Sequence, residues 1–506
     1  MNFDPFAVGV AVLLTFYTIL GASMAYFVQK SGKRFIIAGK RLPLFVVGTM
    51  LFAQALDANS TLGAAAGVQA GGFWVGFAFP LGLALCLFIT GKWFAEPLNR
   101  MNLMTLGDFY FRRYNNKVEV PVVLIMAISF IILVAGNLAG CAWIVKSVFE
   151  IPYIGGLFVI TAILLIYTVS GGLFSSAATD VVQLYPAILA FVLAPIFLIA
   201  TFGWDFFAAA IPEGYADLSG LTSIESGALI NWAGILALAF GDIVALDFME
   251  RVFAAKDERT AKYACYYGGA MTIIAGLGAT ILGLMAFALY PDLADPRDTL
   301  IGLAKNDLPF IIGLFILAGV LGAGLSTANG GALAVSAVFG RNIFHRNILL
   351  PYERRKAAKL GKSVDDLNLD WHELDRKLLN YARLMLIPVF AAAWALAIVR
   401  PEPGVLLVLA FDVVFAGCLA PLVYGLFWPK ANVTGALASV IVGSGLRLLL
   451  YLGIPPVEPG LDTLIPPIVS FVLMFVVSSA TYKTDVPKHN VITEIPNDEM
   501  VARGYA

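Results

Sequence analysis

The segment AQALDANSTLG, residues 53 to 63, places a carboxylate and several small polar side chains inside a long apolar stretch. Asp57 is the only charged residue between Leu44 and Trp74. An unpaired carboxylate is costly in hydrocarbon, so an intramembrane acid indicates a function. The neighbouring Gly, Asn, Ser and Thr compete with helical hydrogen bonds, which predicts a break in the helix. Freed carbonyls at a break can bind a small hard cation. The alternative is an Asp57 that is simply paired with a Ser or Thr of a neighbouring helix.

A second polar patch interrupts the apolar sequence LAGVLGAGLSTANGGALAVSA, residues 317 to 337. Ser326, Thr327 and Asn329 lie there among glycines and alanines. Small residues let helices approach closely, so tight packing is one explanation of this composition. Two adjacent hydroxyls beside backbone carbonyls are also the oxygen ligands that suit a dehydrated Na⁺. The segment by itself leaves both explanations open.

Four further acidic residues fall in apolar segments: Asp180, Asp242, Asp247 and Asp412. Asp180 lies in YTVSGGLFSSAATDVVQ, near the expected start of a helix, where the helix dipole alone would favour an acid. Asp242 lies deep enough in its segment to line a site. Asp247 falls nearer the end of the same segment, where pairing with Arg251 is the simpler explanation. Asp412 has no evident partner in the sequence.

Composition excludes several classes of protein. Of the 506 residues 60% are hydrophobic and 13% are charged, about half the charged share of a soluble domain, so the chain is expected to lie in a membrane. The net charge of −1 gives no attraction to nucleic acid. The cysteines fall in apolar segments without metal-ligand spacing: Cys86, Cys141, Cys265 and Cys418. The histidines fall in polar segments: His345, His372 and His489. An enzyme with an intramembrane metal or nucleophile is therefore not expected, and no ATP-binding loop motif occurs.

Thirteen stretches are long and apolar enough to cross a bilayer as helices. They are expected near residues 6–28, 44–70, 73–91, 118–147, 153–172, 178–202, 227–249, 262–290, 309–338, 380–399, 404–428, 431–453 and 464–482. The first has no cleavage-site pattern and is interpreted as a retained helix. The positive-inside rule then gives the orientation, because an outside N-terminus puts 28 of the 33 Lys and Arg residues in cytoplasmic segments. The longest polar segment, 339–379, is interpreted as a cytoplasmic linker in preference to a regulatory domain.

Five segments, in this order, resemble the sodium:solute symporter family. They are FAEPLNRMNLMTLGDFYFRRY, GGLFSSAATDVVQ, RVFAAKDERTA, LSTANGGALAVSAVFGRNIF and LAPLVYGLFWPKANVTGALAS. The resemblance covers roughly residues 40 to 450 and implies an all-α integral membrane protein with a LeuT-like core. Spans two to six and seven to eleven would form two inverted repeats of five helices each, with spans two and seven broken at mid-membrane.

The resemblance also divides the chain. Residues 1–43 would hold an extra helix and a cytoplasmic loop, 44–202 the first repeat and 203–428 the second repeat, including the loop at 339–379. Residues 429–482 would form two peripheral helices, and 483–506 a cytoplasmic tail. The implied location is the cell membrane.

One conserved sodium site of that family takes backbone carbonyls from broken span two and a carbonyl with two hydroxyls from span nine. In this sequence the resemblance places it at Ala55, Ala58, Ala323, Ser326 and Thr327. Asp57 would add negative charge beside the ion or orient the break. Some members hold a second cation with an acid equivalent to Asp180. Here Asn329 and Gly330 stand at its hydroxyl positions, and because a glycine side chain offers no ligand we expect one Na⁺ per solute.

The implied function is secondary active transport, in which Na⁺ influx drives uptake of a small polar organic solute such as an amino acid, a monocarboxylate or a choline-like molecule. Residues expected to face the solute are Asn59, Ser60, Thr61, Phe240, Asp242 and Asp412. The expected partners are Na⁺ as coupling ion, the solute and the lipid bilayer. One alternative is a proton-coupled transporter, in which Asp57 or Asp180 carries the proton. Another is a solute-sensing membrane receptor, disfavoured because no signalling domain follows Tyr482.

Overall fold

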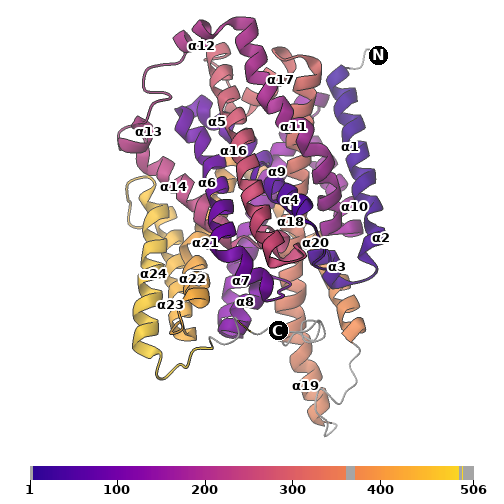
Figure 1. Cartoon of the computed structure of the whole chain (residues 1–506), viewed down its shortest axis with the longest axis vertical. Coiled ribbons are helices and arrows are strands. Elements are labelled where there is room, and N and C mark those ends of the chain that lie inside the picture. The colour runs from indigo at the N-terminus through magenta and orange to yellow at the C-terminus, as the bar shows by residue number, and fades with distance from the viewer. Residues whose placement is uncertain (1–3, 360–370, 489–492, 494–506) are drawn as a thin grey trace.

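The computed structural model describes residues 4–359, 371–488 and 493, and its regular elements are helices (Figure 1). Ten helices or consecutive helical runs are long and apolar enough to cross a membrane. They begin with or consist of α1 (Pro5–Ser23), α6 (Phe73–Ile89), α9 (Asn116–Phe149), α10 (Tyr153–Gly171), α11 (Leu173–Phe202), α16 (Glu258–Leu289), α18 (Phe310–Val338), α20 (Trp371–Val399), α23 (Val433–Tyr451) and α24 (Leu461–Thr481).

Broken helices supply the remaining spans. The pair α14 (Ala228–Gly241) and α15 (Leu246–Ala254) is bent by 52° around the short turn η2 (Asp242–Val244). The pair α21 (Pro403–Gly417) and α22 (Leu419–Phe427) is bent by 47°, which brings the candidate spans to twelve. Helices α4 (Leu44–Ala55) and α5 (Ala58–Gly71) follow each other across two non-helical residues. With this pair, each of the thirteen expected ranges contains helix.

Helix α18 runs through the centre of the bundle (Figure 1). Every residue from Ile316 to Val338 is buried, which explains why this segment is apolar or small on all faces. Helices α23 and α24, yellow in Figure 1, pack on one side of the molecule, and α1 lies on the other. Short helices lie at one end: α12 (Trp204–Ala210), α13 (Ser219–Thr222) and α17 (Thr299–Asn306).

Two predicted boundaries differ from the structure. Helix α11 was expected to start near residue 178, but it begins at Leu173, directly after Gly172. The turn between α10 and α11 consists of Gly172 alone. Its φ of 55° is a conformation that favours a residue without a Cβ. Asp180 therefore lies two turns inside the helix, and the explanation of this acid by the dipole of a first turn is wrong.

The second difference is that the helices of spans nine and ten extend into the range 339–379. Span nine continues without interruption into η4 (Phe339–Leu349) and α19 (Leu350–Lys359), and α20 already begins at Trp371. Residues 360–370 lie outside the described residues. Within the described part this linker is therefore helical, as an extension of two spans.

Buried ion pairs hold η4 against α8 (Leu106–Arg113) and the start of α9. Asp108 accepts hydrogen bonds from Arg341 Nε at 2.8 Å and Arg346 Nη2 at 2.7 Å. Arg346 also pairs with Glu119, and Asn342 donates to the same Glu119 at 2.7 Å. These five side chains are at most 5% exposed. Each of these buried charges thus has an opposite charge beside it. The pairing offsets the free energy needed to remove a charge from water.

Candidate functional site

The break between α4 and α5 satisfies its own backbone. Asp57 is extended, and its Oδ1 accepts the Ser60 N–H at 2.8 Å, so it is the N-cap of α5. Ser60 Oγ donates to the carbonyl of Ala55 at 2.7 Å, and Thr61 Oγ1 donates to the carbonyl of Leu56 at 3.2 Å. The polar run that follows the acid therefore repairs the hydrogen bonds that the break removes, as the sequence predicts for a break at membrane depth.

Asp57 also has partners on neighbouring segments. Asn137 Nδ2, from α9, donates to Asp57 Oδ2 at 2.6 Å. Asn59 Nδ2 donates to the carbonyl of Leu133 at 3.1 Å and lies 3.4 Å from the same carboxylate oxygen. Pairing with another helix was one of the two sequence interpretations of this acid, but the partner is an asparagine. Sequence reasoning missed Asn137, although it is a lone amide in an apolar run.

Helix α18 crosses directly beside the break. A Cβ added at Gly324 would lie 2.7 Å from the Ala58 Cβ, so glycine is needed for this approach. Thr327 Oγ1 lies 3.4 Å from the carbonyl of Ala53, in the last turn of α4. Residues three and four apart share a helix face, so Ala323 lies on the same side of α18 as Ser326 and Thr327. The structure thus places the predicted sodium ligands on two segments that face each other.

Ser326 differs from the other hydroxyls of this region. Its Oγ is buried and makes no hydrogen bond of normal geometry among the described residues, although the carboxylate of Asp180 is close enough to interact with it. Most buried hydroxyls are hydrogen-bonded, so an unpaired one needs an explanation. Beside it lies Asp180, whose Oδ1 accepts from Gln183 Nε2 at 3.1 Å. The Oδ2 of Asp180 is likewise buried without a partner in the part of the chain that the structure describes.

A buried arginine lies over Gly330, at the position where the family resemblance implies a second cation in some members but not here. Arg251 Nη1 lies 2.8 Å from Asp247 Oδ2, which confirms the ion pair expected between these residues. A Cβ added at Gly330 would meet the same guanidinium at 2.8 Å from Nη2, so no serine could replace that glycine without displacing the arginine. The positive charge of Arg251 also acts on Asp180. Asn329 is engaged through Nδ2 with Ser176 Oγ at 2.6 Å.

The two broken spans are joined to each other. Gln54 Nε2, in α4, donates to Asp242 Oδ1 at 3.0 Å, and Asp242 begins the turn that breaks span seven. Asp242 is fully buried, so this hydrogen bond couples the positions of the two breaks. Asp242 lies between the two halves of its span, at the depth that the sequence predicts.

The structure does not gather the expected solute-facing residues into one pocket. Asn59 and Ser60 lie at Asp57, and their side chains are engaged there. Phe240 stacks on Phe415 with ring centroids 5.9 Å apart, and both line a cavity beside α24. Asp412 lines another cavity and pairs with Arg447 of α23, a partner that sequence reasoning missed. The structure thus places Phe240 and Asp412 in two cavities that no described residue of α4 or α5 lines.

Comparison with known proteins identifies the family. The model of the sodium:solute symporter family matches residues 35–362 and 367–443, which is most of the chain. The chain belongs to this family. As a sodium:solute symporter it is a transporter and not an enzyme, and it couples the movement of a small solute to Na⁺.

Several symporters of known solute are similar over most of their length. The sodium/pantothenate symporter of Escherichia coli (strain K12) is 28% identical over 81% of both chains. The high-affinity choline transporter 1 of Torpedo marmorata is 24% identical over 82% of this symporter and 69% of the relative. The osmoregulated proline transporter OpuE of Bacillus subtilis (strain 168) is 26% identical over 68% of each.

A solved structure shows the same fold. The substrate-bound outward-open state of a Na⁺-coupled sialic acid symporter superposes with a TM-score of 0.77 at 15% identity. The match covers 95% of this symporter and 98% of that chain. The LeuT-like architecture expected from the sequence is thereby confirmed.

Proposed function

We propose that one Na⁺ binds between the α4–α5 break and α18, at the carbonyls of Ala55, Ala58 and Ala323 and the hydroxyls of Ser326 and Thr327. The observation that carries this proposal is the close approach of α18 to the break, with Thr327 Oγ1 3.4 Å from the Ala53 carbonyl and with a buried Ser326 hydroxyl that makes no hydrogen bond of normal geometry among the described residues. A carbonyl oxygen has two lone pairs, so the Ser60 hydrogen bond to Ala55 leaves one lone pair for a cation. All five ligands would be oxygens, as a hard cation prefers.

Binding at this position would couple the ion to the solute. A Na⁺ held by both segments fixes the short half-helix α5 against α18 and so completes a solute pocket beside the break. Coupling requires that each ligand bind one conformational state better than another. With the N-terminus outside, as the Lys and Arg distribution indicates, inward Na⁺ movement contributes about 2.3 kcal/mol per 100 mV of membrane potential.

The solute would be a small polar organic molecule. The relatives named above carry pantothenate, choline or proline, which differ in charge but are all small and polar. An amino acid, a monocarboxylate or a choline-like solute is therefore the class to screen.

Uptake into liposomes tests the sodium site. Purified protein is given labelled members of each class with an inward Na⁺ gradient or an equal K⁺ gradient at constant pH. We expect accumulation only with Na⁺. The double substitution Ser326→Ala with Thr327→Ala should raise the Na⁺ concentration for half-maximal uptake by about a hundredfold, or about 2.7 kcal/mol.

Ser336→Ala is the matched control. Ser336 is buried in the same helix, but its Oγ donates a hydrogen bond to the Leu333 carbonyl at 2.7 Å. It should leave the Na⁺ dependence unchanged. Uptake that ignores Na⁺ and follows a pH step would contradict the proposal and favour proton coupling through Asp57 or Asp180.

We further propose that Arg251 takes the place of a second cation beside Asp180. The arginine is fully buried and occupies the space over Gly330 that a hydroxyl ligand would need. Uptake should therefore depend on Na⁺ with a Hill coefficient near one. A coefficient near two that falls to one in Asp180→Asn would show instead that this acid binds a second Na⁺.

A further inference from the structure

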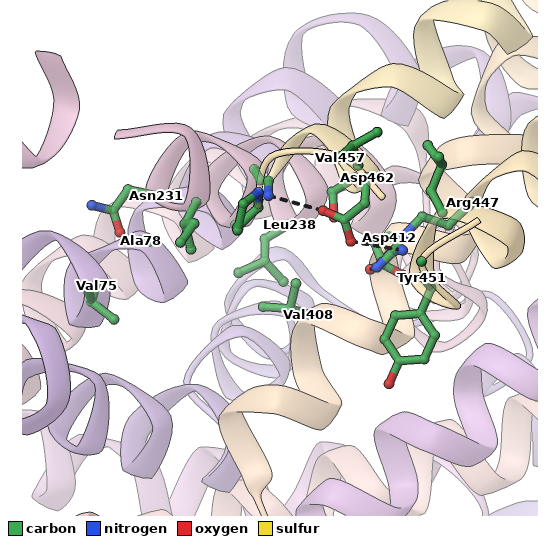
Figure 2. A pocket seen from close by; sticks show the side chains of 18 of the residues that line it. Val75, Ala78, Asn231, Leu238, Val408, Asp412, Arg447, Tyr451, Val457 and Asp462 are labelled. Atoms are coloured by element: carbon green, nitrogen blue, oxygen red, sulfur yellow. Dashed lines mark hydrogen bonds and ion pairs between the residues drawn. The ribbon is translucent and has the colours of Figure 1, made fainter. Parts of the chain in front are cut away.

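A cavity of about 550 Å³ lies between α6, α14, α21 and α23, beside the segment that leads into α24 (Figure 2). In the described part of the chain no residue of α4, α5 or α18 lines it, so it is separate from the proposed sodium site. Its volume is that of a pocket for a small organic molecule. Val75, Ala78, Leu238 and Val408 give it an apolar wall, as Figure 2 shows.

The charged groups gather at one end of this cavity, and the polar side chain of Asn231 lies at the other (Figure 2). Arg447 reaches between Asp412 and Asp462, with Nε 3.0 Å from Asp412 Oδ2 and Nη1 3.1 Å from Asp462 Oδ2 (Figure 2). Two carboxyl groups face one guanidinium, so acidic groups outnumber basic groups at this end. Asp462 is held in place because its Oδ1 accepts the Gly460 N–H at 3.1 Å.

One carboxylate oxygen of this cluster accepts no hydrogen bond from the described residues. Asp412 is 1% exposed, and its Oδ1 has no hydrogen-bond partner among the residues that the structure describes. A buried carboxylate oxygen without a donor is unfavourable. The site is therefore incomplete without a donor, and the cavity beside it has room for one.

The charge and shape of the cavity select the class of ligand. Nη1 of Arg447 makes no hydrogen bond of normal geometry among the described residues, but an anion beside it would also meet the carboxyl groups of Asp412 and Asp462. A bare metal ion would find too few ligands, since the described residues contain no group of three His, Cys, Asp or Glu that could hold one. A ligand with a positively charged donor group and an apolar body would match the free oxygen of Asp412, the excess of acidic groups and the apolar wall.

We propose that this cavity is a second ligand site, which binds a small amphiphile carrying a protonated amine or an ammonium group. The ligand would lie against α14 and α21, the first halves of two bent spans, and would thereby influence their movement. This site goes beyond the proposed transport function and does not rest on it.

Binding of radiolabelled 4-phenylbutylamine to the full-length protein tests the proposal. The protein is placed in nanodiscs of phosphatidylglycerol, which has no ammonium group, and 4-phenylbutanol and 4-phenylbutyrate serve as neutral and anionic competitors. We expect saturable binding of the amine that neither analogue displaces. Phosphatidylethanolamine added to the nanodiscs would compete if a lipid headgroup uses the same site, which would also support the ligand chemistry.

Two variants and two controls locate the binding. Asp462→Asn keeps the acceptor for Gly460 but removes a charge, and it should weaken binding at least about fivefold, or about 1 kcal/mol. Ala78→Leu fills the apolar wall and should abolish binding. Glu458→Gln, an exposed carboxylate of the same segment, should bind normally, and so should the Ser326→Ala, Thr327→Ala double variant.

The proposal is overturned if the wild-type protein does not bind the amine. It is also overturned if 4-phenylbutanol or 4-phenylbutyrate competes equally, or if both cavity variants bind like the wild type. Loss of binding in the Ser326, Thr327 double variant would place the amine in the transport pathway and would overturn it as well.

Discussion

Asp57→Ala is expected to abolish Na⁺-driven uptake, whereas Asp57→Asn should fold normally and transport with weaker Na⁺ affinity. Alanine removes the N-cap of α5, which is worth about 1 kcal/mol. It also leaves the Ser60 N–H and Asn137 Nδ2 without their buried acceptor, at about 1–3 kcal/mol each. These costs fall on the one segment whose position defines the proposed sodium site, so the break should lose its shape.

Asparagine can replace most of these contacts. Its side-chain oxygen can cap the Ser60 N–H, and its NH2 group can donate to Asn137 Oδ1 if the Asn137 amide turns over, which breaks the 3.3 Å hydrogen bond from Asn137 Nδ2 to the Leu133 carbonyl. The main loss is then the negative charge. We expect the Na⁺ concentration for half-maximal uptake to rise about tenfold, or about 1.4 kcal/mol, with little change in thermal stability.

The measurements are Na⁺-dependent uptake in liposomes and thermal unfolding of the same purified variants. Asp257→Ala is the matched control, because Asp257 caps α16 through the Thr260 N–H at 2.7 Å but lies far along the chain from the break. It should lose stability and keep its Na⁺ affinity. Wild-type uptake by Asp57→Ala would show that the cap is not needed for transport.

The position of the break could be predicted from sequence because its cause is local. A capping acid followed by Ser60 and Thr61 supplies, within five residues, the donors and acceptors that a broken helix requires. The spans could be predicted for the same reason, since length and apolar character are properties of each segment. The order of the motifs then implied the fold that the structural comparison confirms.

The partners of Asp57 and Asp412 could not be predicted, because they come from distant segments, whereas the partner of Asp247 lies four residues away in the same helix. Asn137 meets Asp57 across 80 positions, and Arg447 meets Asp412 across 35. Nothing in either local sequence identifies its partner. The start of α11 was placed wrongly for a different reason, because the Ser- and Gly-rich composition before Asp180 suggested a longer turn than Gly172 alone forms.

Asp108→Ala should destabilise the fold strongly, with a loss of about 3–5 kcal/mol in the free energy of unfolding. The substitution removes the carboxylate that receives Arg341 Nε, Arg346 Nη2 and the Met104 N–H. Two buried guanidinium groups would then lose the carboxylate that they share, and a buried charge that loses its partner is far more costly than an exposed one. Glu258→Ala, which breaks the exposed pair with Arg100, should cost at most about 1 kcal/mol.

The pH dependence of unfolding distinguishes this electrostatic role from simple packing. Burial alone would raise the pKa of Asp108, but the adjacent Arg341 and Arg346 outweigh it and lower the pKa below its usual value. The favourable contribution of the carboxylate is therefore complete above the unfolded pKa of about 3.9. It is lost as the pH falls through the lower folded pKa. Wild-type protein should lose stability below about pH 4, and Asp108→Asn, already destabilised at pH 7, should lose less over the same interval. Equal acid sensitivity of the two proteins would contradict this account and leave Asp108 with a packing role.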